Sequence, residues 1–186
     1  PYLAMSMEIQ PELTDLLSSE NLDAAMEYVS NAGSKAENVR QKLRWEKRAL
    51  ALTLAVGDLA GRLTLTDVIT RLSDFADRAL DEAIVDIYAQ RYPDADPDGF
   101  AVIGLGKHGS RELNYSSDID LIVFYDTLVC KCADGVEPSV FFTRMTRQLV
   151  SIMQDMTGDG YVFRMDLRLR PDPRSTPLAI SVGAAA

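Results

Sequence analysis

Histidine and cysteine are nearly absent from this 186-residue sequence, which has one histidine and two cysteines. Cys130 and Cys132 stand in a C-x-C spacing, and a disulfide between residues so close together would be strained. A single histidine leaves no set of Cys and His ligands for a structural zinc ion. We therefore expect two reduced thiols in a loop, which is typical of a cytoplasmic protein.

Basic charge and long apolar runs are also scarce. The 19 Lys and Arg residues against 28 Asp and Glu residues give a formal net charge of −9, so a surface that follows a nucleic-acid backbone is not expected. No apolar run reaches the roughly 18 residues that a membrane-spanning helix needs, and no segment has the pattern of a signal peptide. The expected partners are proteins or small molecules, with no nucleic acid and no membrane.

The hydrophobic pattern of residues 1–92 predicts helices. Ser34 and Glu37 have the spacing of a capping box, in which the serine oxygen accepts from the backbone N–H three residues further on. Thr64 and Asp67 have a similar arrangement before a long amphipathic stripe. We expect a helical lead-in region with one helix beginning at each of these two caps.

The turn-rich segment PDADPDG at 93–99 marks the expected boundary, because the hydrophobic period changes after it. Residues 99–186 then alternate between strand and helix patterns, which indicates an α+β chain. The ends of the sequence lack the polar tails of a finished domain, so we expect a piece of a longer protein. The expected elements are a strand at 100–105, a short helix at 107–115, a strand at 119–125, a helix within 137–157 and a strand at 161–169.

Asp118 and Asp120 lie two residues apart at the start of an otherwise apolar strand and therefore on one face of it. Two adjacent carboxylates repel each other, so either this face is open to water or a cation binds there. Asp166, in the strand predicted at 161–169, offers a third hard oxygen ligand. The three together suit Mg²⁺, which in such sites stabilises charge during displacement at phosphorus.

The strand at 161–169 alternates cleanly after Val162, so we expect one apolar face and one face that presents Asp166 among arginines. Arg164, Arg168 or Arg170 could donate charge-assisted hydrogen bonds to phosphate groups.

The glycines at 104, 106 and 109 admit two interpretations. They spell G-x-G-x-x-G after a strand, as in a dinucleotide-binding turn. However, the segment before the next strand is short for a crossover helix, and this interpretation gives the aspartates no role. We favour the other interpretation, in which Gly109 and Ser110 form a turn at a helix N-terminus whose backbone N–H groups bind phosphate.

The run GLGKHGSRELNYSSDIDLIVFYD, followed by GYVFRMDLRLRPDP, closely resembles the nucleotidyltransferase domains of bacterial glutamine synthetase adenylyltransferases. These bifunctional enzymes add AMP to a tyrosine of glutamine synthetase and remove it. The resemblance extends over about residues 37–182. It implies a polymerase-beta-like nucleotidyltransferase core, with a mixed sheet and flanking helices over residues 99–186.

By this resemblance, Asp118, Asp120 and Asp166 match the catalytic, metal-binding carboxylates of the family, and Gly109 and Ser110 match its phosphate-binding turn. The further residues assigned to phosphate and nucleotide binding are Lys107, Ser117, Arg168 and Arg170. Position 108 is usually apolar in the family, and for His108 a substitution on the surface of a helix is favoured over a role as catalytic base.

The motifs ELNYSSDIDLI and FRMDLRLRPDP resemble the N-terminal half of these enzymes, which removes AMP. The implied reaction is a Mg²⁺-dependent phosphorolysis in which phosphate attacks adenylyl-tyrosine and gives ADP and tyrosine. The implied partners are glutamine synthetase, the signalling protein PII, nucleotide and phosphate, with control by glutamine and 2-oxoglutarate. Two alternatives stay open: the adenylylating half of the same enzymes, and a nucleotide-binding regulatory module without turnover.

Overall fold

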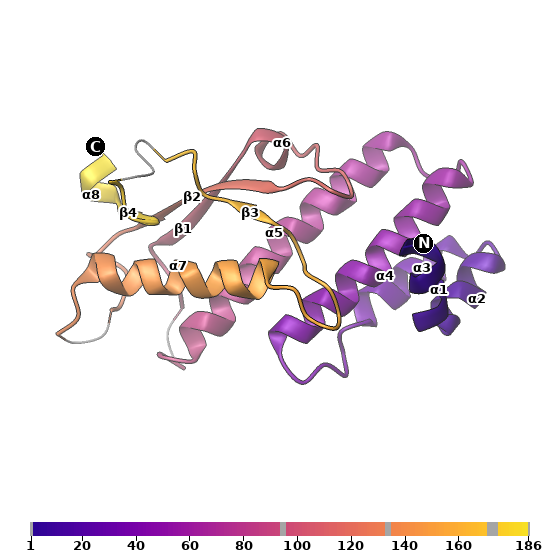
Figure 1. The fold of residues 1–186 in the computed structure, drawn as a ribbon, viewed down its shortest axis with the longest axis horizontal. Coiled ribbons are helices and arrows are strands. Elements are labelled where there is room, and N and C mark those ends of the chain that lie inside the picture. The colour runs from indigo at the N-terminus through magenta and orange to yellow at the C-terminus, as the bar shows by residue number, and fades with distance from the viewer. Residues whose placement is uncertain (1, 94–95, 133–134, 171–174, 186) are drawn as a thin grey trace.

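The computed structural model describes residues 2–93, 96–132, 135–170 and 175–185 (Figure 1). It confirms an α+β fold in which helices flank an open, mixed four-stranded sheet. The elements in chain order are α1 (Tyr2–Ile9), α2 (Pro11–Ser18), α3 (Leu22–Asn31), α4 (Val39–Leu59), α5 (Leu65–Ala89), β1 (Phe100–Leu105), α6 (Gly106–Gly109), β2 (Ile119–Tyr125), α7 (Pro138–Gln154), β3 (Met165–Asp166), β4 (Ala179–Ser181) and α8 (Val182–Ala185).

The two predicted helix caps have different outcomes. Thr64 and Asp67 form the expected capping box at the start of α5, each side chain accepting from the other's backbone N–H. The capping box predicted at Ser34 is wrong, because α4 begins at Val39 and its N-cap is Asn38, whose side chain accepts from the backbone N–H of Gln41. This amide oxygen, four residues later than predicted, satisfies one of the exposed N–H groups of the helix end.

The sheet places β2 at its centre. β1 pairs with β2 in antiparallel register, and β3 and β4 both pair with β2 in parallel. The odd-numbered residues of β2, from Ile119 to Tyr125, are buried, whereas the even-numbered residues are half-buried. On the buried face the ring of Phe142 in α7 stacks on Tyr125, with the ring centroids 4.4 Å apart. One face of the sheet therefore packs on the helices, and the other face is more open.

The strand predicted at 161–169 is much shorter in the structure, where β3 consists of Met165–Asp166 alone. The backbone N–H groups of Val162 and Phe163 both donate to the carbonyl of Met153, at 2.8 and 3.1 Å. Both side chains are buried, which the expected alternation does not allow. The chain is thus held against the end of α7 before it reaches the sheet. Leu169, expected in the core, is 53% exposed.

The helix predicted at 107–115 is also wrong in length, since α6 ends at Gly109. Arg111 has a φ of +60°, a left-handed conformation that cannot continue a right-handed helix. The chain then runs without regular structure to β2.

The lead-in helices and the sheet region share one apolar core, to which α4, α5, α7 and β2 all contribute buried side chains. Figure 1 shows α5 running from the N-terminal helices to the sheet. The division into domains at 1–92 and 99–186 stays a prediction, and Asp94 and Ala95 of its linker lie outside the described residues.

Among the described residues both cysteines are free thiols, as expected. No helix in the described part of the chain is long and apolar enough to cross a membrane.

Candidate active site

The three predicted carboxylates belong to the open face of the sheet. Asp120 in β2 and Asp166 in β3 are directly paired in parallel register. Asp118 precedes Asp120 by two residues, and the side chains of Ile119 and Leu121 between and after them point into the core. The acids interrupt an apolar strand without entering the core, because their positions alternate with the buried ones.

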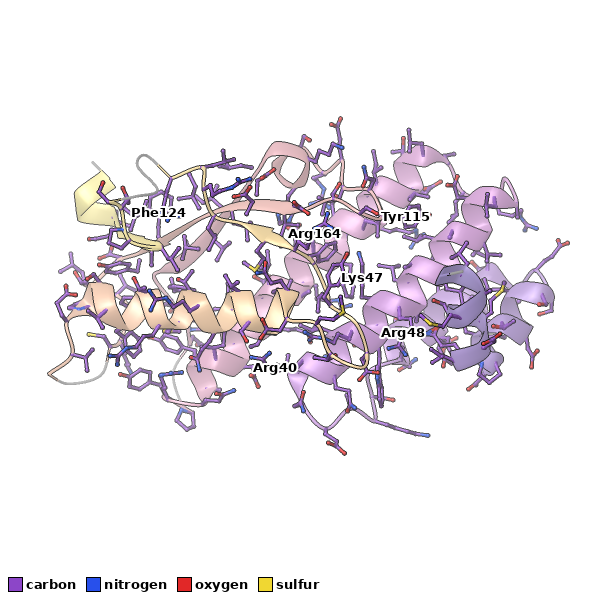
Figure 2. The ribbon with its side chains drawn as sticks, viewed as in Figure 1. Arg40, Lys47, Arg48, Tyr115, Phe124 and Arg164 are labelled. Carbon is purple, nitrogen blue, oxygen red and sulfur yellow. The ribbon has the colours of Figure 1, made fainter. Side chains whose placement is uncertain are left out.

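Arginine side chains from the segment around β3 bind two of these acids. Nε of Arg164 donates to Oδ1 of Asp118 at 2.5 Å, and Nη2 of Arg164 donates to the carbonyl of Ser116 at 3.0 Å. The guanidinium of Arg168 donates to both carboxylate oxygens of Asp166, at 2.5–3.0 Å. Two of the three arginines predicted to flank Asp166, Arg164 and Arg168, therefore lie at the acids (Figure 2 labels Arg164).

These contacts set the protonation of the site. The pKa of the Asp166 carboxyl lies below its ordinary value, chiefly because the Arg168 side chain donates to it and also because the backbone N–H of Arg168 does. The same hydrogen bond raises the pKa of Arg168, and the hydrogen bond with Asp118 raises that of Arg164. The pair of Asp166 and Arg168 is therefore charged on both sides at neutral pH.

The carboxylates do not form a ready-made metal centre: in the residues that the structure describes, no three His, Cys, Asp or Glu side chains are grouped to hold an ion. Asp118 and Asp166 instead face the two arginines. The donor set nevertheless fits Mg²⁺ chemically, because it consists of carboxylate oxygens on neighbouring strands. Arg164 and Arg168 have long side chains that are 56% and 83% exposed, so both can rotate away from the acids.

Gly106 is a site residue that the sequence-based prediction missed. It has a φ of +53°, and a Cβ atom there would overlap Oδ2 of Asp120. The missing side chain thus lets the start of α6 lie directly against one of the proposed ligands. The signal in the sequence was the second glycine of G-x-G-x-x-G, which has this function here and not that of a dinucleotide turn.

Gly109 and Ser110 lie at the C-terminal end of α6, so their placement at a helix N-terminus is wrong. The backbone N–H of Ser110 donates to the carbonyl of Gly106 at 3.0 Å. A Cβ atom on Gly109 would lie 2.6 Å from the carbonyl oxygen of Gly104. Close packing of the backbone therefore accounts for a glycine at this position. A helix dipole therefore does not support phosphate binding here.

The remaining predicted residues lie on α6, directly before β2 and after β3. Lys107 is exposed on α6, and Ser117, directly before Asp118, accepts from the backbone N–H of Asn114 at 3.1 Å. Arg170 donates to the backbone carbonyls of Leu167 and Thr176.

Known proteins match this chain along its whole length. The family model described as glutamate-ammonia ligase adenylyltransferase matches residues 3–186. The chain belongs to the glutamate-ammonia ligase adenylyltransferase family. It is 40% identical over 205 residues to a relative from Brucella suis and 41% identical over 194 residues to one from Agrobacterium fabrum. Each is named a bifunctional glutamine synthetase adenylyltransferase/adenylyl-removing enzyme.

The match covers only part of these members of the glutamate-ammonia ligase adenylyltransferase family. All of this chain aligns with the Brucella suis protein but only 21% of that protein is covered, and 98% of the chain covers 19% of the Agrobacterium fabrum protein. The chain thus spans about a fifth of the length of its curated relatives.

His108 differs from the expectation for this family member, because its side chain is 4% exposed and does not lie on a helix surface. Nε2 lies 2.7 Å from Oδ1 of Asp77 in α5, while Nδ1 is buried with no hydrogen-bond partner among the described residues. The ring packs on Gly104, where a Cβ atom would lie 3.0 Å from Nδ1. His108 is too enclosed to act as a base on a large protein substrate.

Proposed function

We propose that this chain carries the adenylyl-removing activity of its family and releases AMP from adenylylated glutamine synthetase by phosphorolysis. The observation that carries this proposal is the set of three carboxylates, Asp118, Asp120 and Asp166, on one face of the sheet beside Arg164 and Arg168. The names of the relatives support glutamine synthetase as the substrate.

In the proposed reaction an oxygen of inorganic phosphate forms a bond to the adenylyl phosphorus while the bond from phosphorus to the tyrosine Oη breaks. The proton of the attacking phosphate goes to the phenolate, and the products are ADP and tyrosine. Charge builds up on the phosphoryl oxygens during such a displacement. We propose that Arg168 and Lys107 donate to these oxygens, because both are exposed and cationic at the rim of the site.

Gly109, Ser110 and Ser117 are proposed to contact phosphate or nucleotide from the loop between β1 and β2. Ser110 and Ser117 supply hydroxyl groups, and Gly109 allows close approach of the backbone. Arg170 is proposed to act from the loop after β3, where its hydrogen bonds to Leu167 and Thr176 place it.

We propose that Asp118, Asp120 and Asp166 hold Mg²⁺. Bound there, the ion would supply positive charge to the phosphate oxygens and relieve the repulsion between the carboxylates. Binding requires Arg164 and Arg168 to release Asp118 and Asp166, and the freed guanidinium groups would then be available to the substrate phosphates. Mg²⁺ should raise the melting temperature because it binds the folded state alone. An unchanged melting temperature in millimolar Mg²⁺ with ADP would count against this site.

The adenylyl-removing direction rests on the similarity of ELNYSSDIDLI and FRMDLRLRPDP to that half of the family, although Pro171, Asp172 and Pro173 lie outside the described residues. PII as a partner and a cytoplasmic location are proposed on the same family basis. Since the relatives are named as bifunctional, the adenylylating half is the second candidate.

Two assays separate these candidates. Purified protein is given adenylylated glutamine synthetase with phosphate and Mg²⁺, or unmodified synthetase with ATP and Mg²⁺. We expect ADP release in the first assay and no AMP transfer in the second. The reverse result would assign the chain to the adenylylating half, and binding of nucleotide without either activity would indicate a regulatory module.

The mutational test compares Asp120, in β2, with Asp126, directly after β2. Asp120→Asn should abolish ADP release and leave the melting temperature unchanged or higher, because it removes one of the repelling charges. Asp126→Asn is the matched control, since Asp126 directly follows the other end of β2 and accepts from the backbone N–H of Leu128, which an amide oxygen can also do. Full activity of Asp120→Asn would remove the proposed metal site.

A further inference from the structure

The loop that carries α6 is fastened to α5 by three neighbouring side chains of that helix. Asp77 binds His108 and Arg111, and Asp74 also binds Arg111. One turn before Asp77, the hydroxyl of Ser73 accepts from the backbone N–H of Leu113 at 3.4 Å. These contacts join positions more than thirty residues apart in the chain.

Asp77 occupies a special place among them, because each of its carboxylate oxygens has a different partner. Oδ1 accepts from Nε2 of His108 at 2.7 Å, and Oδ2 accepts from Nη1 of Arg111 at 3.0 Å. His108 directly precedes Gly109, and Arg111 directly follows Ser110. One carboxylate thus holds both ends of the Gly109–Ser110 dipeptide.

The fastened segment lies against the proposed site. Gly106, at the start of α6, has its backbone next to Oδ2 of Asp120. His108 is only two residues further on, with its ring enclosed against Gly104. The backbone hydrogen bonds of this loop, such as the one from the N–H of Glu112 to the carbonyl of Lys107 at 2.7 Å, join residues of the loop to one another and do not fix its position relative to α5.

We propose that Asp77 is a positioning residue, which orients α6 and the Gly109–Ser110 turn toward the carboxylates through His108 and Arg111. This role rests on the proposed function, since it deepens the account of the same site. The side chains of Asp77 and Arg111 are both 49% exposed, and ion pairs this exposed contribute little to stability. The His108 ring, by contrast, is buried against Gly104 and bonded to Asp77, so it links the position of α6 to that of α5.

The kinetic test is a double-mutant cycle on ADP release by this protein. Asp77→Ala and His108→Leu should each lower kcat/KM about 10–100-fold, the range found for residues that orient ligand groups. The loss should fall mainly on the KM for inorganic phosphate, and the double variant should be no worse than the more affected single variant. His108→Gln retains an N–H donor at the place of Nε2 and should restore most of the activity.

Asp81→Asn is the matched control, because Asp81 lies one helical turn beyond Asp77 and lines the same groove between α5 and β1. Its kcat/KM should stay within about twofold of the wild type. Losses that multiply in the double variant, or an Asp77→Ala variant with wild-type kinetics, would overturn the positioning role. So would a loss in His108→Gln equal to that in His108→Leu.

A spectroscopic arm separates this inference from the proposed function. His108 is the only histidine of the chain, so its ring gives a single set of NMR signals. Asp77→Asn should shift the Nε2 signal and Asp81→Asn should leave it in place. An unchanged signal in Asp77→Asn overturns the inference whatever the activity. If the signal shifts in Asp77→Asn but the wild-type protein releases no ADP, the proposed function is overturned and the link between α5 and α6 stands.

Discussion

Arg44 joins the lead-in helices to the sheet region through hydrogen bonds, and its removal is the sharpest test of this junction. The side chain is 2% exposed. Its guanidinium donates to the carbonyls of Ile152, Asp155 and Gly160 at 3.0, 2.6 and 2.7 Å, and to that of Arg40 within α4. The three distant carbonyls lie at the end of α7 and in the following turn, beyond the last N–H donors of the helix. That of Gly160 also accepts from the backbone N–H of Thr157 at 3.1 Å.

The expected cost of Arg44→Met follows from these acceptors. An acceptor left buried without a partner costs about 1–3 kcal/mol. The carbonyl of the buried Ile152 loses its donor in this variant, whereas Gly160 keeps the backbone N–H of Thr157 and Asp155 is exposed to water. The apolar replacement fills part of the volume and removes the cost of burying a charge, which offsets some of this loss. We expect the free energy of unfolding to fall by about 1–3 kcal/mol, and the melting temperature of a chain this long to fall by about 2–12 °C.

Urea unfolding followed by tryptophan fluorescence measures this change. Trp45 is the only tryptophan, and its Nε1 donates to Oδ1 of Asp159 at 3.0 Å, in the same turn that Arg44 binds. The control is Arg62→Met, because Arg62 is 55% exposed and pairs with the 82% exposed Glu20. It should change stability by less than about 0.5 kcal/mol. A cost for Arg44→Met below about 1 kcal/mol would refute the reasoning, since it would mean that water replaces the guanidinium.

Two further predictions concern Lys47 and Gly106. Burial lowers the pKa of the Lys47 ammonium from 10.5 to about 7, and its Nζ lies 3.7 Å from the ring centroid of Phe163 (Figure 2). The unfolded chain therefore binds one more proton than the folded chain between about pH 7 and 10.5, so this group makes stability rise with pH across that window by up to about 1.4 kcal/mol per unit. Lys47→Met should raise the free energy of unfolding most below pH 7, and this gain should shrink toward pH 10. Urea unfolding at several pH values measures it. A gain that does not depend on pH would contradict the lowered pKa of Lys47. Gly106→Ala should lower the free energy of unfolding by about 1–2 kcal/mol and abolish ADP release, because of its left-handed φ and the overlap with Asp120. Gly158→Ala, where a Cβ atom would meet nothing within 4 Å, is the control for both measurements, and equal effects would argue against the overlap.

Much of the fold could be predicted from local signals. The capping box of Thr64 and Asp67 depends on neighbouring residues alone, and so does the alternation that places Asp118 and Asp120 on one face of β2. The strand predicted at 161–169 from the alternation after Val162 was wrong, because a tertiary contact determines the local structure there. The carbonyl of Met153 accepts from two consecutive N–H groups, and no pattern in residues 161–169 signals this.

The sequence predicted that Asp120 and Asp166 lie close together, but not the contacts that support the neighbouring loop. Asp166 was expected beside Asp120, and the parallel register places it there. The link from Asp77 to His108 could not be predicted, because it depends on how α5 crosses the sheet region and on a ring that the sequence pattern placed on a surface. Contacts between a helix and a loop that are distant in the sequence produce no periodic pattern in either segment.

The three glycines of G-x-G-x-x-G show why a motif needs its structural context. In a dinucleotide-binding turn these glycines let the backbone approach a pyrophosphate. Here Gly104 makes room for the His108 ring, Gly106 for the Asp120 carboxylate and Gly109 for the Gly104 carbonyl. Each absent side chain is matched to a protein group. The same spacing therefore arises because a single helical turn is folded tightly onto the end of β1, and that close packing brings α6 against the carboxylates of the proposed site.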